Sequence, residues 1–186
     1  MNPELANRSV RLLLVTGSTR RASTNTAALH VARTLLGEDS AVVYDGLAGL
    51  PAFNPDDDYT PLPPAVAELR SAIAAADAVV FCTPEYAGTL PGSFKNLLDW
   101  TVGGSEIHKP VTWINVAGPG RGGGADSTLT TVLGYVGGRV LESSGIRVLV
   151  AHQAVGPDGL ISDEETRGRL AQALATIVAD VRETLS

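Results

Sequence analysis

The sequence contains very little cysteine: Cys82 is the single one among 186 residues. A lone cysteine excludes an internal disulfide framework and fits a reducing compartment. Long apolar runs are also missing, since the longest one near the N-terminus, residues 10–15, is far too short to span a bilayer. Residues 1–9 are polar and show no small-residue cleavage pattern, which argues against a secretory signal. We expect a cytoplasmic protein with no membrane partner.

Positive charge is not in excess. Lys and Arg number 14 against 20 Asp and Glu, which gives a formal net charge of -6. Nucleic acids and anionic membranes are bound through a basic face that displaces counterions, so we expect neither as a partner. A few backbone donors and one or two arginines can still hold a phosphate on an acidic protein. The charge therefore excludes classes of partner without choosing the ligand.

Groups of metal-ligating residues are scarce as well. The three histidines, His30, His108 and His152, have no acidic or cysteine partner at ligand spacing, and residues 56–58 lack the downstream pattern of a calcium loop. Cys82 ends an apolar segment with no histidine nearby, which is typical of a buried thiol rather than a nucleophile. The sequence predicts no metal site.

The chain does show a regular alternation of strand and helix patterns, with no internal repeat, low-complexity tract or linker. Apolar runs typical of buried strands lie at residues 10–16, 41–44, 78–83, 111–117 and 147–151. Helical stripes lie at residues 25–36, 64–76, 92–101, 124–135 and from 162 onward, where Ser162 and Glu165 form a capping box. We expect one domain over residues 1–186, with residues 1–8 as a loose N-terminal tail.

Strands that alternate with helices form a parallel sheet covered on both faces. Five such strands predict an α/β flavodoxin-like three-layer sandwich, with a five-stranded parallel sheet in the order 2-1-3-4-5. Ligands bind such sheets beyond the carboxyl ends of the strands, where the order reverses. The loops after the first, third and fourth strands are therefore the expected places for a site.

The loop after the first strand, residues 17–26, concentrates hydroxyl, amide and guanidinium groups around a helix start. Gly17 permits a tight turn, and backbone amides at a helix N-terminus attract an anion. The spacing fits neither a Walker loop nor a dinucleotide fingerprint, so a monophosphate is the better match. The alternative is that one of these residues only caps the helix, but capping needs one residue and the loop supplies several. The predicted phosphate ligands are Ser18, Arg20, Ser23, Thr24 and Asn25.

The loop after the third strand, residues 83–92, has the sequence TPEYAGTLPG and is made stiff by two prolines and two glycines. Such a loop can form a wall for a flat heteroaromatic ring, because its peptide groups reach the polar edge of the ring and its small residues let the ring approach. An ordinary connection between a strand and a helix is the alternative. The spacing alone does not choose between them.

Two motifs together resemble the NADPH-dependent FMN reductase family, which contains flavin, quinone, chromate and azo reductases. The first is Gly17-Ser18-x-Arg20-x-x-Ser23-x-Asn25, and the second is Thr83-Pro84-Glu85-Tyr86-x-Gly88-x-Leu90-Pro91-Gly92-x-x-Lys95-Asn96-x-x-Asp99-Trp100. The resemblance covers the chain from the first strand through the helix after the fourth strand.

The resemblance implies a non-covalently bound FMN, with NADPH or NADH as the electron donor. The five polar residues named above would hold its phosphate, and the isoalloxazine ring would be lined by Pro84, Glu85, Tyr86, Ala87 and Gly88. Residues 93–100 would help form a subunit interface, because family members are commonly homodimers or homotetramers. Ala87 stands where the family often has Asn or another polar residue, so we expect one side-chain contact to the flavin to be lost.

The glycine-rich loop after the fourth strand matches GxGxxG over residues 118–123, but it is not a dinucleotide fingerprint. It follows the fourth strand, its second position is proline, and no strand ends in an acidic residue at the required distance. Its amides, a helix dipole and Arg121 instead predict a site for the pyrimidine edge of a reduced flavin. Gly118, Gly122 and Gly123 are the other candidates there. A flexible surface turn is the alternative.

The sequence thus predicts an FMN-dependent NAD(P)H oxidoreductase that transfers hydride from NADPH through bound FMN to a quinone, a flavin or another small-molecule acceptor. The flavin carries the chemistry, so we expect no side chain as catalytic acid or base. The main alternative is a non-enzymatic flavodoxin-like electron-transfer protein, and a further one is a family member that has lost its flavin. We expect the long loop over residues 46–64 to form the rim of the site, with Phe53 and Tyr59 facing the substrate.

Overall fold

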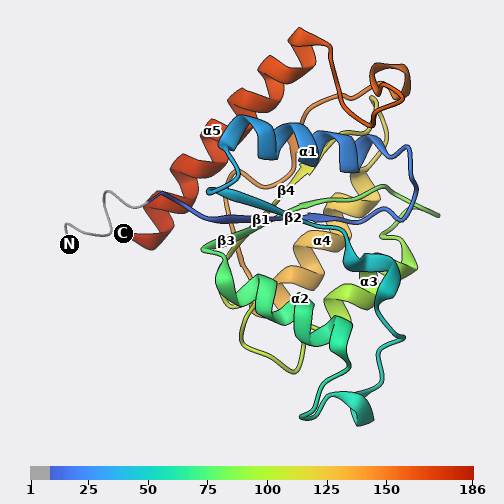
Figure 1. Ribbon diagram of the computed structural model, residues 1–186, viewed down its shortest axis with the longest axis vertical. Helices are drawn as coiled ribbons and strands as arrows, with labels where there is room; N and C mark the ends of the chain where they lie inside the picture. Colours follow the sequence, from blue (N-terminus) through green and yellow to red (C-terminus); the bar gives the residue numbers. More distant parts are fainter. Residues whose placement is uncertain (1–8) are drawn as a thin grey trace.

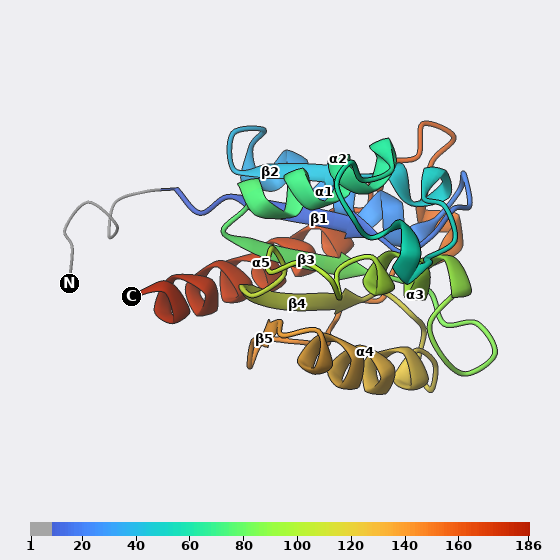
Figure 2. The same ribbon diagram turned by 90° about the horizontal axis from the view of Figure 1, so that it is seen from below.

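The computed structural model describes residues 9–186, so the predicted tail over residues 1–8 lies outside the described residues. One sheet runs through the molecule (Figure 1), and its strands follow the order β2-β1-β3-β4-β5 (Figure 2). Strand β6 also pairs with β4, and every pairing is parallel. The strands are β1 (Leu12–Thr16), β2 (Ala41–Tyr44), β3 (Ala78–Cys82), β4 (Pro110–Asn115), β5 (Arg139–Val140) and β6 (Ile146–Arg147). The predicted parallel sheet and its order are confirmed.

Helices cover both faces of this sheet. They are α1 (Thr24–Leu36), α2 (Pro64–Ala75), α3 (Gly92–Asp99), α4 (Gly123–Tyr135) and α5 (Glu164–Leu185), with short 3-10 turns η1 (Gly46–Gly49), η2 (Pro55–Asp57) and η3 (His152–Ala154). Helices α1 and α5 lie on one face and α2, α3 and α4 on the other (Figures 1 and 2).

Alternation of side chains along the strands explains the two layers. Leu12 and Leu14 of β1 belong to the apolar core beneath α1 and α5, whereas Leu13 and Val15 belong to the core beneath the other three helices. All four are buried, because a central parallel strand is covered on both sides. Among residues 9–186, none of the helices combines the length and the apolar character required to cross a bilayer.

The fifth position of the sheet differs from the predicted strand over residues 147–151. It is divided into β5 and β6, because residues 141–145 bulge out opposite only two residues of β4. The amide of Leu141 donates to the Val111 carbonyl and that of Gly145, at φ +76°, donates to the Trp113 carbonyl. Residues after β6 still run beside β4, since Val148 N donates to Asn115 O at 2.9 Å.

The start of α5 also differs from the prediction. Asp163, not Ser162, caps this helix: its side chain accepts from Thr166 N at 2.8 Å. Glu165 points along the helix instead of back toward the cap and pairs with Arg169 at 2.5 Å. The hydrogen bond from Thr166 holds the pKa of Asp163 below its usual value.

Candidate functional site

A cleft of about 430 Å³ lies beyond the carboxyl ends of the strands, where the sheet order reverses between β1 and β3. Its size is that of a small-molecule site. The loops after β1, β3 and β4 converge on it, and the predicted residues that line it are Ser18, Arg20, Ser23, Thr24, Asn25, Pro84, Glu85, Tyr86, Gly118, Arg121 and Gly122. Three predicted residues, Ala87, Gly88 and Gly123, do not line it. Five others line it without having been predicted: Ala22, Val116, Ala117, Val150 and His152.

Gly17 connects β1 to the first of these loops, and its role is close approach rather than an unusual turn. A Cβ at this position would fall 2.2 Å from Thr83 Oγ1 and 2.9 Å from Thr83 Cα. Gly17 N donates to Cys82 O at 2.8 Å, which continues the β1–β3 ladder by one residue. The missing side chain therefore lets the first and third loops begin side by side.

The N-terminus of α1 opens into the cleft. Ser23 caps it, with Oγ accepting from Thr26 N at 3.3 Å and the carbonyl accepting from Ala27 N at 2.9 Å. The backbone amides of Thr24 and Asn25 have no acceptor within residues 9–186. Capping thus accounts for Ser23 but leaves two amides of the first turn as free donors, the arrangement that favours an anion.

The buried thiol of Cys82 orients the side chain of Asn25. Cys82 Sγ donates to Asn25 Oδ1 at 3.4 Å, and burial raises the pKa of this thiol, which keeps it protonated as the donor. With Oδ1 engaged, the Nδ2 group of Asn25 is the remaining donor of a side chain that lines the cleft. The prediction that Cys82 is a buried thiol is confirmed.

The loop after β3 forms a two-residue hairpin. Tyr86 N donates to Thr89 O at 3.0 Å and Thr89 N donates to Tyr86 O at 3.1 Å, with Ala87 and Gly88 at the tip. Both tip residues have positive φ, +50° and +76°, as this kind of turn requires. Because the tip lies outside the cleft lining, Ala87 and Gly88 shape the wall through the turn rather than by side-chain contact.

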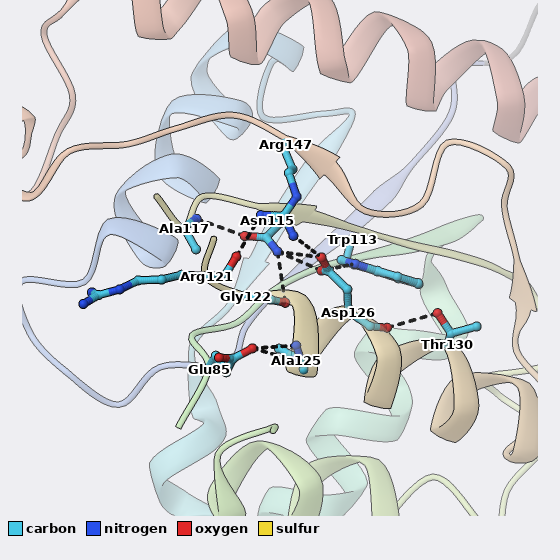
Figure 3. Close-up of polar contacts among 11 residues, drawn as sticks. Glu85, Trp113, Asn115, Ala117, Arg121, Gly122, Ala125, Asp126, Thr130 and Arg147 are labelled. Carbon is cyan, nitrogen blue, oxygen red and sulfur yellow. Dashed lines mark hydrogen bonds and ion pairs between the residues drawn. The ribbon is translucent and has the colours of Figure 1, made fainter. Parts of the chain in front are cut away.

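Glu85 joins this loop to α4 (Figure 3). Its Oε2 accepts from Gly124 N at 2.6 Å and from Ala125 N at 3.1 Å, so the carboxylate caps the helix. The sequence predicted that the amides and dipole of α4 face the pyrimidine edge of a flavin. Two amides of its first turn instead donate to Glu85, so they are not available to a ligand. The Arg121 side chain, exposed at the cleft, makes no hydrogen bond or ion pair within the described part of the chain and remains available there.

His152 is the main polar residue that the sequence prediction missed. Its Nε2 lies 3.0 Å from Arg20 Nη2 at the rim of the cleft. A guanidinium can only donate, so Nε2 accepts and the imidazole carries its proton on Nδ1. His152 follows the fifth strand, at the same edge of the sheet as the other loops, and this position could have indicated from the sequence that it lies at the site.

The long loop between β2 and α2 is held against α3 and does not line the cleft. Phe53 N donates to Asn96 Oδ1 at 2.7 Å, Trp100 Nε1 donates to Pro51 O at 2.9 Å, and the Phe53 and Trp100 rings meet edge to face at 5.0 Å. Tyr59 is exposed and also lies outside the cleft lining. Neither Phe53 nor Tyr59 lines this cleft, and that they face the substrate stays a prediction.

Known proteins are similar to this chain in sequence. The NAD(P)H-dependent FMN reductase of Pseudomonas aeruginosa is 31% identical over 178 residues, which cover 93% of this chain and 96% of that protein. The NADPH azoreductase of a Bacillus species is 37% identical over 116 residues, which cover 61% of this chain and 62% of that protein.

A solved structure shares the fold as well. FerB from Paracoccus denitrificans, a flavoenzyme NAD(P)H:(acceptor) oxidoreductase, has a TM-score of 0.78 at 26% identity, covering 94% of this chain and 98% of that one. The family model of the NADPH-dependent FMN reductases matches residues 10–152. The resemblance seen in the two motifs is thereby confirmed, and the chain belongs to the NADPH-dependent FMN reductase family.

Proposed function

We propose that this protein is an FMN-dependent NAD(P)H oxidoreductase, which passes hydride from NADPH or NADH through bound FMN to a small acceptor such as a quinone or a flavin. The observation that supports this most is the convergence of three loops on one cleft, with free donors at one helix N-terminus and a stiff hairpin opposite. The names of the family and of its relatives point to the same activity.

The residues of the cleft fit FMN in their chemistry. Hydroxyl, amide and guanidinium donors gather at the start of α1, where a phosphate would be held by Ser18, Arg20, Ser23, Thr24 and Asn25. The loops after β3 and β4 line the rest of the cleft, where a ring would be lined by Pro84, Glu85, Tyr86, Gly118, Arg121 and Gly122. Ala87, Gly88 and Gly123 would act through the conformation of the two loops.

When bound, FMN supplies the hydride chemistry, and the protein supplies binding and orientation. Glu85 is fixed at the N-terminus of α4, which keeps its carboxylate from serving as a mobile acid. Arg20 and Arg121 add positive charge to the cleft, and Tyr86, 54% exposed, stands at its mouth. The proposed hydride transfer therefore needs no side chain as a catalytic acid or base.

We propose further that the protein is a cytoplasmic, single-domain homodimer or homotetramer. In the predicted interface segment, residues 93–100, the apolar side chains are already buried in the protomer core. Lys95 and Asp99 pair at 2.6 Å on the outer face, so an interface there would be polar. Light scattering coupled to gel filtration measures the assembly, and a monomer would contradict this part.

Anaerobic reduction tests the proposed activity. FMN-loaded protein mixed with NADPH should lose its yellow absorbance rapidly, and a quinone added afterwards should restore it. Protein that binds FMN but stays yellow with NADPH and NADH would be an electron carrier instead. Protein that does not bind FMN at all would be the flavin-less alternative.

A further inference from the structure

The carboxylate of Asp126, in the first turn of α4, is the centre of a polar network beneath the glycine-rich loop (Figure 3). Trp113 Nε1 donates to Oδ1 at 2.8 Å, and Asn115 Nδ2 lies 2.8 Å from both oxygens. Arg147 Nη2 pairs with Oδ2 at 2.7 Å. Groups from β4 and β6 thus meet on one side chain of α4.

Two members of this network hold the main chain of the loop at three points. Asn115 Oδ1 accepts from Ala117 N at 2.9 Å, and Asn115 Nδ2 donates to Gly122 O at 3.3 Å. Arg147 Nη1 donates to Arg121 O at 2.9 Å. Gly122 has φ +82°, and a Cβ there would fall 2.5 Å from Asn115 Nδ2. These contacts argue against the alternative that the loop is a flexible surface turn.

The negative charge of Asp126 favours the orientation of the Asn115 amide that the loop contacts require. A carboxylate only accepts, so it must face Nδ2, and Oδ1 is then left to accept from Ala117 N. If the Asn115 amide turned over, Nδ2 would meet the Ala117 amide and Oδ1 would meet the Gly122 carbonyl. Both contacts to the loop would be lost, because each would oppose two donors or two acceptors.

The segment held in this way forms one side of the cleft, which Ala117, Gly118, Arg121 and Gly122 line, whereas Asp126 does not. We infer that Asp126 is a positioning residue for flavin binding: through Asn115 and Arg147 it fixes the loop against which the ring lies. This rests on the proposed binding of FMN in the cleft. Packing alone would not require such a network, since apolar side chains of similar volume serve that purpose as well.

The test compares Asp126→Asn with two matched variants. Asp180→Asn removes a carboxylate outside the cleft lining, one that accepts a hydrogen bond from the backbone amide of Ser143 at 2.8 Å. Arg20→Gln removes a predicted phosphate contact. Flavin fluorescence quenching gives the Kd of each apoprotein for FMN and for riboflavin, which lacks the phosphate. Amide hydrogen exchange of residues 117–122 is followed in the same apoproteins, so that one readout needs no flavin.

In Asp126→Asn we expect the Kd for FMN and that for riboflavin to rise by the same factor, about tenfold or more, the loss of one charge-assisted hydrogen bond. Arg20→Gln should raise the Kd for FMN but not that for riboflavin. Asp180→Asn should leave both Kd values unchanged. Exchange of residues 117–122 should quicken only in Asp126→Asn. A general loss of stability would also weaken both flavins equally, but it would quicken amide exchange throughout the protein and not in residues 117–122 alone.

The two proposals fail separately. If the wild-type protein binds FMN and Asp126→Asn binds both flavins within about twofold of it, the positioning role is overturned while the proposed function stands. If the wild-type protein binds no flavin, the proposed function fails and with it the flavin part of this role. Unchanged exchange of the loop in Asp126→Asn overturns the anchoring itself in either case.

Discussion

Two neighbouring glycines in the first turn of α4 provide a sharp test of how the loops of the cleft meet. A Cβ added at Gly124 would fall 1.9 Å from the carbonyl oxygen of Gly88 and 2.7 Å from its carbonyl carbon. A Cβ added at Gly123 would meet nothing within 4 Å. Neither glycine has positive φ, so alanine fits the backbone at both positions. The two substitutions therefore differ only in what the new methyl group touches.

The expected effects have opposite signs. Gly123→Ala should raise the free energy of unfolding by about 0.5 kcal/mol, because alanine restricts the unfolded chain. In Gly124→Ala the hairpin must retreat by more than about 1 Å to restore an ordinary C···O distance of about 3.3 Å. Overpacking of this kind costs about 1–3 kcal/mol, and the retreat also stretches the hydrogen bond from Gly124 N to Glu85. We expect a net loss of about 2 kcal/mol or more.

Urea denaturation followed by far-UV circular dichroism measures both free energies. The melting temperature should fall by roughly 4–8 °C in Gly124→Ala and rise slightly in Gly123→Ala, given about 2–4 °C per kcal/mol for a domain of this size. FMN binding should weaken in Gly124→Ala, since the hairpin forms one wall of the cleft. Equal stability of the two variants would refute the close approach of the hairpin to α4.

Three further predictions concern other parts of the chain. Ala87→Gly should raise the free energy of unfolding by about 1 kcal/mol in urea denaturation, because φ +50° at Ala87 is strained for a side chain. Arg70→Met should lower it by about 3 kcal/mol, since Arg70 pairs with Asp58 at 2.7 Å and donates to the Trp100 carbonyl, and both partners would be left unpaired; a loss below about 1 kcal/mol would contradict the burial of this pair. Burial, with a smaller contribution from nearby carboxylates, raises the pKa of Tyr44 to about 12, so the folded state holds a proton that the unfolded state releases near pH 10. Stability from this group is complete below about pH 10 and is lost between about pH 10 and 12, and in a tyrosinate absorbance titration the last phase should vanish in Tyr44→Phe.

The sheet was predictable because buried parallel strands carry a continuous apolar pattern. Residues 12–16 and 78–82 are buried at every position and were found from sequence within a residue or two of each end. The fifth strand was placed too late because β5 and β6 hold two residues each and none of the four is buried. The bulge between them, closed by Gly145 at positive φ, has no periodicity that a sequence pattern could reveal.

The site was predictable to the level of loops but not of individual contacts. Topology alone brings the ends of β1, β3 and β4 together, so residues such as Ser18 and Pro84 could be paired in advance. The partner of the Glu85 carboxylate lies 39 positions along the chain, and no local pattern indicates it. The contact between Arg20 and His152 spans 132 positions and depends on where the chain leaves the interrupted fifth strand. Such long-range side-chain contacts follow from packing, which the sequence pattern does not determine.

The two helices that begin at the cleft differ in the charge they offer a ligand. The first turn of α4 contains Asp126 and is capped by Glu85, so its positive end is compensated within the protein. The first turn of α1 contains no acidic residue, and Arg20 lies close by in the cleft. Glu85 is the one acidic residue in the described lining. An anionic phosphate is therefore favoured at α1 and not at α4, which would orient the proposed ligand and let a chain of net charge -6 hold it.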